Sequence, residues 1–146
     1  MGRMRRKTMW FWVIVLILVG GIVYGLSFWQ TSSGVKPPLP TVKVGSVTAE
    51  VKQSTYCWAN GDEAVCEDHA LPEPDDLQIV TVEPGATIDV SFHEAPDNET
   101  FHQIVDGELI PAERIVPSEP GVYLFETGGD WANGDSRYVF GVEVTE

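Results

Sequence analysis

The chain has 146 residues, of which nine are Lys or Arg and 22 are Asp or Glu, so its net charge at pH 7 is −13. All 22 acidic residues follow position 30, whereas four of the nine basic residues lie among the first seven. Because this acidic excess repels nucleic acids and anionic lipid headgroups at long range, DNA or RNA binding is excluded.

Residues 8–29 form an uncharged, mostly apolar stretch that directly follows the basic start MGRMRRK. As a helix it spans roughly 33 Å, against a bilayer core of about 30 Å. Since Lys and Arg flanks stay on the cytoplasmic side, we predict a cytoplasmic tail over 1–7 and a single-pass signal-anchor over 8–29, with the C-terminal part extracellular. The alternative is a cleaved signal peptide, but bulky Phe28, Trp29 and Gln30 occupy the place where such peptides carry small residues.

Residues 30–41, QTSSGVKPPLPT, predict a short linker that becomes semi-rigid at its prolines, followed by one acidic domain over 42–146. After position 30, five Lys or Arg oppose 22 Asp or Glu, which gives this part a net charge of −17. Such a surface attracts cationic partners or divalent metals. The alternative, which the scattered charges favour, is that they only keep the domain soluble.

The domain has no sustained helical periodicity and instead alternates short apolar runs with turn residues. Candidate strands in chain order are 42–51 with a bulge at Gly45-Ser46, 77–82, 88–92, a hairpin of 104–105 and 109–110 around Asp106-Gly107, 122–127, and 138–144. In the last of these, Tyr138, Phe140, Val142 and Val144 share one face. About seven or eight short strands in one domain predict an immunoglobulin-like β-sandwich.

Cys57 and Cys66 predict a structural disulfide, because an even number of cysteines is typical of proteins in oxidising compartments. A two-residue turn at Asn60-Gly61 would set Cys57 opposite Ala64, whereas a turn at Gly61-Asp62 sets it opposite Cys66. We therefore predict the disulfide and a glycine-first type II′ turn together. A redox-active pair is the alternative, and the acidic surroundings disfavour the thiolate that it needs.

The pentapeptide Trp-Ala-Asn-Gly-Asp occurs twice, at 58–62 and at 131–135. The same glycine-first turn in the second copy predicts that Trp131 lies opposite Tyr138. We favour two similar hairpin tips whose tryptophans lie in the core. The alternative is a composite binding surface in which both tips meet. Its candidate binding residues are Trp58, Asn60, Asp62, Trp131, Asn133 and Asp135.

The sequence predicts no catalytic residue, no metal ligand set and no cofactor. His69, His93 and His102 lie near carboxylates, but their spacings of 24 and 9 residues lack the short-spaced pair typical of zinc sites. Asp75-Asp76 and 97–99 offer oxygen ligands without the twelve-residue calcium pattern. Motifs of nucleophilic, zinc-peptidase and phosphate-loop chemistry do not occur.

Several short motifs are shared with a known group of proteins: Tyr56-Cys57-Trp58, Cys66-Glu67-Asp68, Val82-Glu83-Pro84-Gly85, Pro120-Gly121-Val122-Tyr123, and Trp131 followed by Tyr138-Val139-Phe140. With these the chain resembles small, uncharacterised exported proteins of Gram-positive bacteria that are membrane-anchored or lipidated. The resemblance implies an extracellular immunoglobulin-like sandwich with a local disulfide, and it supplies no activity. The chain departs from lipidated members by its transmembrane segment.

Together these features predict a non-enzymatic, membrane-anchored extracellular binding module of the bacterial envelope. Its partner would be a neighbouring envelope protein, a cationic peptide or a cell-wall component. One alternative is a sensor or chaperone that responds to divalent metals through the acidic loops. Another is an exported enzyme, for which no catalytic constellation is present in the sequence.

Overall fold

The computed structural model describes residues 36–146 together with Val15 and Ile17. The predicted cytoplasmic tail, the rest of the predicted anchor and residues 30–35 of the predicted linker lie outside the described residues. In the part of the chain that the structure does describe, no helix is long and apolar enough to cross a membrane.

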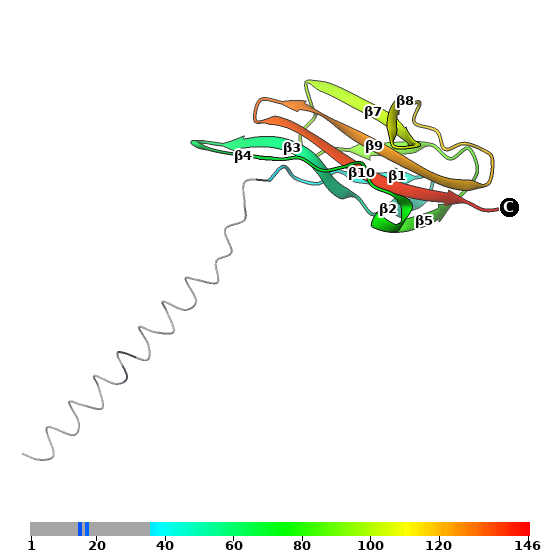
Figure 1. The fold of residues 1–146 in the computed structure, drawn as a ribbon, viewed down its shortest axis with the longest axis horizontal. Coiled ribbons are helices and arrows are strands. Elements are labelled where there is room, and N and C mark those ends of the chain that lie inside the picture. Colours follow the sequence, from blue (N-terminus) through cyan, green and yellow to red (C-terminus); the bar gives the residue numbers. More distant parts are fainter. Residues whose placement is uncertain (1–14, 16, 18–35) are drawn as a thin grey trace, which may run out of the picture. The chain divides into compact units, whose positions relative to one another are not determined.

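The described domain is all-β, as the sequence predicts (Figure 1). Its elements are β1 (Thr41–Val44), β2 (Val47–Ala49), β3 (Lys52–Asn60), β4 (Glu63–Glu67), a 3₁₀ turn η1 (Pro74–Asp76), β5 (Ile79–Val82), β6 (Ile88–Ser91), β7 (Asn98–Val105), β8 (Glu108–Pro111), β9 (Gly121–Trp131) and β10 (Gly134–Val144). They form a three-stranded sheet in the order β2-β1-β6 and a seven-stranded sheet in the order β4-β3-β10-β9-β7-β8, with β5 parallel to β10.

The strand prediction over 42–51 is wrong in one respect. The phase change at Gly45-Ser46 is a hairpin turn and not a bulge, because Val44 pairs with Val47 and the two halves run antiparallel as β1 and β2. Gly45 has a φ of +59°, a left-handed conformation that glycine adopts without steric cost. A bulge and a tight turn both interrupt the alternation of apolar residues, so the apolar pattern alone does not distinguish them.

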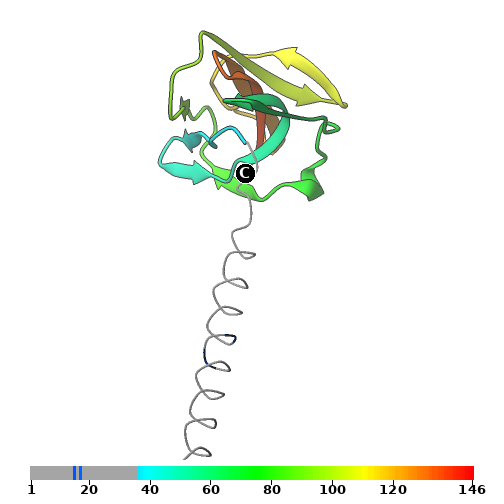
Figure 2. The same ribbon diagram turned by 90° about the vertical axis from the view of Figure 1, so that its left-hand side faces the viewer.

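The core lies between the two sheets, which face each other (Figure 2). Alternation along the strands delivers Val42 and Val44 from the smaller sheet and Phe125, Phe140 and Val142 from the larger one. The predicted apolar face of the last strand is confirmed, since its four side chains from Tyr138 to Val144 are each at most 2% exposed.

The opposite face of the larger sheet is partly covered as well. Ile104, Leu124 and Val139 form a second apolar cluster on this outer face, and Leu71 and Leu77 from the segment between β4 and β5 pack against it. Gly141 allows close packing here, because an added Cβ would collide with the Ile79 side chain. The hairpin of β3 and β4 extends beyond the rest of the domain at one end (Figure 1).

Candidate functional site

The first pentapeptide forms the turn that the cysteines predict. Cys57 and Cys66 are directly paired and disulfide-bonded, with their Cα atoms 4.0 Å apart. Asn60 pairs with Glu63, so the turn consists of Gly61 and Asp62, and of these two only Gly61 has positive φ, at +65°. The predicted disulfide and glycine-first register are therefore both confirmed.

The second pentapeptide forms a different turn, and the predicted pairing of Trp131 with Tyr138 is wrong. Trp131 pairs with Gly134, so the turn is Ala132-Asn133, and Tyr138 pairs with Thr127. This difference comes from the neighbouring strand β3. The Ala59 amide donates to the Asn133 carbonyl at 2.8 Å, and Asn133 Nδ2 donates back to the Ala59 carbonyl at 3.0 Å.

Gly134 fixes this second register. It lies opposite Trp58 in the ladder between β3 and β10, with a φ of +137°. An added Cβ at this position would collide with the Cys57 carbonyl oxygen. Only glycine allows β3 to approach so closely, so the tip of the second hairpin is held against the strand that carries the first.

The two pentapeptide tryptophans meet in an aromatic cluster. The Trp58 and Trp131 ring centroids are 5.6 Å apart with planes at 69°, and Phe92 lies 5.4 Å from Trp131 in a similar edge-to-face arrangement. Phe92 also contacts Tyr138, with a centroid distance of 6.2 Å. Both tryptophans are partly buried and, within the described domain, belong to neither apolar core cluster. The structure thus brings them together outside the core, as the composite surface requires.

The polar residues of the two tips do not converge in the same way. Asn60 and Asp62 are exposed at the free turn of the first hairpin. Asn133 is engaged with the backbone of β3, and Asp135 lies opposite Cys57 in the ladder. Of the six candidate binding residues, only Trp58 and Trp131 therefore form one site.

A small cavity of about 40 Å³ lies in this aromatic cluster. We call it the aromatic site; its lining residues are Pro38, Trp58, Phe92, His93, Glu94, Trp131 and Tyr138. Trp131 Nε1 donates to the Glu94 carbonyl at 2.8 Å, and the Tyr138 hydroxyl donates to the Pro38 carbonyl at 2.8 Å. These bonds fix one wall of the site and attach residues of the predicted linker to the domain, where Pro37 and Pro40 are buried.

The chemistry of the aromatic site favours a positively charged group. Indole, phenol and benzene rings attract cations through the negative faces of their π systems. None of the described residues that line the site is Lys or Arg, whereas Glu94 supplies a carboxylate. Burial raises the pKa of Tyr138, so its hydroxyl stays neutral and remains a donor to Pro38.

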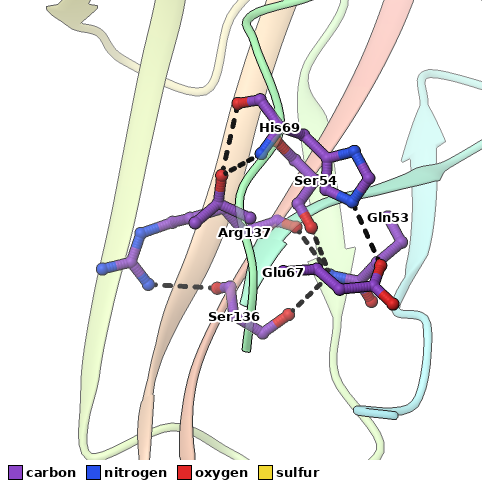
Figure 3. A network of polar contacts seen from close by, with 7 residues as sticks. Gln53, Ser54, Glu67, His69, Ser136 and Arg137 are labelled. Atoms are coloured by element: carbon purple, nitrogen blue, oxygen red, sulfur yellow. Dashed lines mark hydrogen bonds and ion pairs between the residues drawn. The ribbon is translucent and has the colours of Figure 1, made fainter. Parts of the chain in front are cut away.

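A polar network fixes the base of the first hairpin (Figure 3). Gln53 Nε2 donates to Ser136 Oγ at 2.9 Å and to the Arg137 carbonyl at 3.0 Å, across the irregularity that separates Ser136 from Tyr138 in the pairing of β10 with β3. The Glu67 carboxylate lies 3.2 Å from the His69 ring. The Tyr56 hydroxyl and, after it, the His69 ring lower the pKa of Glu67, which pairs with Tyr56 in the ladder between β3 and β4.

The remaining histidines do not gather around a common centre. His93 lines the aromatic site, and His102 lies on the outer face of the larger sheet, where its Nδ1 is 3.8 Å from Glu126 Oε1. Burial raises the pKa of Glu126, while the charges of His102 and Arg137 oppose that rise. Among the described residues, no group of three or more His, Cys, Asp or Glu could hold a metal ion.

Sequence reasoning missed Pro38 and Phe92 as parts of the aromatic site, and it placed Tyr138 beside Trp131 only through the incorrect pairing described above. Their separation in sequence gives no local motif, and Phe92 and Tyr138 also fit the apolar alternation of ordinary strands. Comparison of the chain with protein families, curated proteins and solved structures finds no match.

Proposed function

We propose that the chain is a non-catalytic binding module of the bacterial envelope, held in the membrane by a single N-terminal helix with its acidic domain outside the cell. The observation that carries this proposal is the contact between Trp58 and Trp131, which two separate hairpins bring together at 5.6 Å. Partly exposed tryptophans are uncommon on domain surfaces and are enriched where proteins bind partners.

The partner that we propose presents a cationic group, such as a basic side chain or an ammonium group, to the exposed parts of the two tryptophans, since the cavity of about 40 Å³ holds little more than one water molecule. Tryptophan gives the strongest cation–π attraction of the aromatic side chains, and the site contains two of them beside Glu94. The net charge of −17 after position 30 attracts such a partner from a distance. A neighbouring envelope protein, a cationic peptide or a cell-wall component carrying an ammonium group meets this requirement.

We also propose that the domain is immunoglobulin-like in its topology. The consecutive neighbours β8-β7-β9-β10 support this, because they match the C′-C-F-G order of the corresponding sheet in variable-type domains. In that assignment the β3–β4 hairpin is an addition that pairs with the first half of β10. The aromatic site then lies where this addition joins the sandwich.

Nuclear magnetic resonance of the two indole N–H groups tests the proposed ligand chemistry. The full chain in maltoside micelles is titrated with choline and, separately, with 3,3-dimethylbutanol, which has the same shape without the charge. We expect saturable shifts of the Trp58 and Trp131 signals with choline only, because the cation–π attraction needs the charge. Equal shifts with both compounds, or no shift with choline, would reject the cationic partner.

Protease treatment of intact cells tests the proposed orientation. A protease added outside should remove the C-terminal domain and leave the membrane-embedded N-terminal fragment. Protection of the domain until the cells are lysed would contradict an extracellular location.

A further inference from the structure

A groove on the outer face of the larger sheet is separate from the aromatic site. The segment that connects β4 to β5 crosses this face, and its residues Leu71–Pro74 form one side of the groove. The turn between β7 and β8, with Asp106 and Gly107, forms the other side. The groove encloses about 650 Å³, within the range of about 300–1,000 Å³ that is common for ligand sites.

The floor of the groove is apolar and is not fully covered. Ile104 and Leu124 form its buried part, whereas Val122 on β9 is 44% exposed. Leu109 pairs with Ile104 and is 41% exposed, so the apolar surface continues onto β8. These exposed apolar side chains offer a bound chain segment an apolar surface to pack against.

The sides of the groove are acidic and preformed. Glu73 and Asp106 contribute a carboxylate from each side, and none of the described residues that line the groove is Lys or Arg. Pro72 and Pro74 restrict the backbone on one side. On the other side, Asp106 and Gly107 both have positive φ, at +50° and +76°, as a tight type I′ turn requires.

We propose that this groove binds a peptide segment of a partner protein in which apolar and basic residues alternate. The apolar side chains would pack on Val122 and the floor, while the basic ones would lie beside Glu73 and Asp106. A second copy of this chain is a poor occupant, because its domain carries the same strong negative charge and repels this surface.

Fluorescence anisotropy of a labelled peptide of alternating lysine and leucine tests the proposal, with the full chain in maltoside micelles. The double variant Glu73→Gln and Asp106→Asn removes both charges but keeps an acceptor at the start of η1 and a residue tolerated at positive φ. We expect binding to weaken about fivefold. The matched control, Glu83→Gln with Asp89→Asn, removes two exposed charges elsewhere and should change binding by less than about twofold.

A second pair of variants tests the apolar floor. Val122→Lys should weaken binding about tenfold, because it removes an apolar contact and adds a repelling charge. Ile115→Lys makes the same change at an exposed apolar residue outside the groove and should have little effect. Together these results would support the groove as the peptide site.

The outcomes that overturn the proposal are equally specific. One is an equal loss of peptide binding in the groove variants and in the control variants. The other is that a glutamate–leucine or a lysine–serine peptide binds as tightly as the lysine–leucine peptide. Sedimentation that shows groove variants abolishing self-association without changing peptide binding would assign the groove to a second copy instead. The variants leave Trp58 and Trp131 unchanged, so the fate of this proposal and that of the aromatic site are distinguishable.

Discussion

The two copies of Trp-Ala-Asn-Gly-Asp have the same five residues and form different turns. In the first copy the turn is Gly61-Asp62, at the free end of the β3–β4 hairpin. In the second copy it is Ala132-Asn133, held against β3 by both backbone and side-chain hydrogen bonds. Identical local sequence therefore leaves the register open, and contacts outside the pentapeptide determine it.

The glycine of each copy has a different physical role. Gly61 supplies the left-handed conformation that its turn requires, and no atom within 4 Å would meet an added Cβ. Gly134 is required because the Cys57 carbonyl lies where a Cβ would be. Gly61 therefore has a conformational role alone, whereas Gly134, whose φ is also positive, in addition permits the close approach of two strands.

Replacement of these two glycines should produce the largest difference in stability between the two hairpin tips. Gly134→Ala should destabilise the domain by about 3 kcal/mol, because the ladder between β3 and β10 must separate to make room. Gly61→Ala should cost about 1–2 kcal/mol, the penalty for a left-handed non-glycine residue. Urea denaturation followed by circular dichroism measures both. Equal losses would show that Gly134 is not a close-approach position.

Removing the disulfide should have the next largest effect and should act mainly on the first tip. The double variant Cys57→Ser and Cys66→Ser should lose about 2.5–3 kcal/mol, because the unfolded chain is no longer constrained by the short loop. Hydrogen exchange should accelerate in β4 and remain slow in the second half of β10. Equal acceleration in both regions would contradict separate control of the two tips.

Replacement of the two asparagines by alanine should produce a smaller difference in the free energy of unfolding. Asn133→Ala removes the side-chain hydrogen bond to the Ala59 carbonyl and should cost about 1 kcal/mol. Asn60→Ala, at the exposed tip of the first hairpin, should change the free energy of unfolding by less than about 0.5 kcal/mol. The same urea denaturation compares the two variants. A larger loss of stability for Asn60→Ala would show that the first tip depends more on its asparagine than the second does.

The smallest effect should be a change in the pH dependence of stability that comes from the base of the first hairpin. The Tyr56 hydroxyl is the main cause of the lowered pKa of Glu67, so Tyr56→Phe should raise that pKa toward the usual glutamate range. Because a lowered folded pKa stabilises the folded state above the unfolded pKa, this contribution is lost as the pH falls through the folded value. A carbon NMR titration of the Glu67 carboxyl measures the change. An unaltered midpoint in Tyr56→Phe would show that the Tyr56 hydroxyl does not lower this pKa.

The sequence predicts those features whose physical cause is local. The disulfide requires one register of the first hairpin, and Asp106-Gly107 suits a type I′ turn in any context. Strict alternation from Tyr138 to Val144 likewise defines the core face of β10.

The features that the sequence does not predict depend on distant contacts. The second tip takes its register from β3, which lies more than 70 residues earlier in the chain. The aromatic site gathers Pro38, Phe92 and Tyr138 from three separate segments. The groove exists because the segment before β5 covers only part of the outer face. None of these relations leaves a pattern within one stretch of sequence.

The proposed function requires that the two hairpins build one cation-binding site. A double-mutant cycle on choline binding to the full chain tests it most directly, with Trp58→Leu, Trp131→Leu and their combination, and with Tyr123→Leu as an aromatic control outside the site. If both rings contact the same cation, each single variant should weaken binding about threefold to tenfold, and the combined loss should be smaller than the product of the two. Losses that multiply independently, or variants that bind choline as well as the unaltered chain, would contradict the claim.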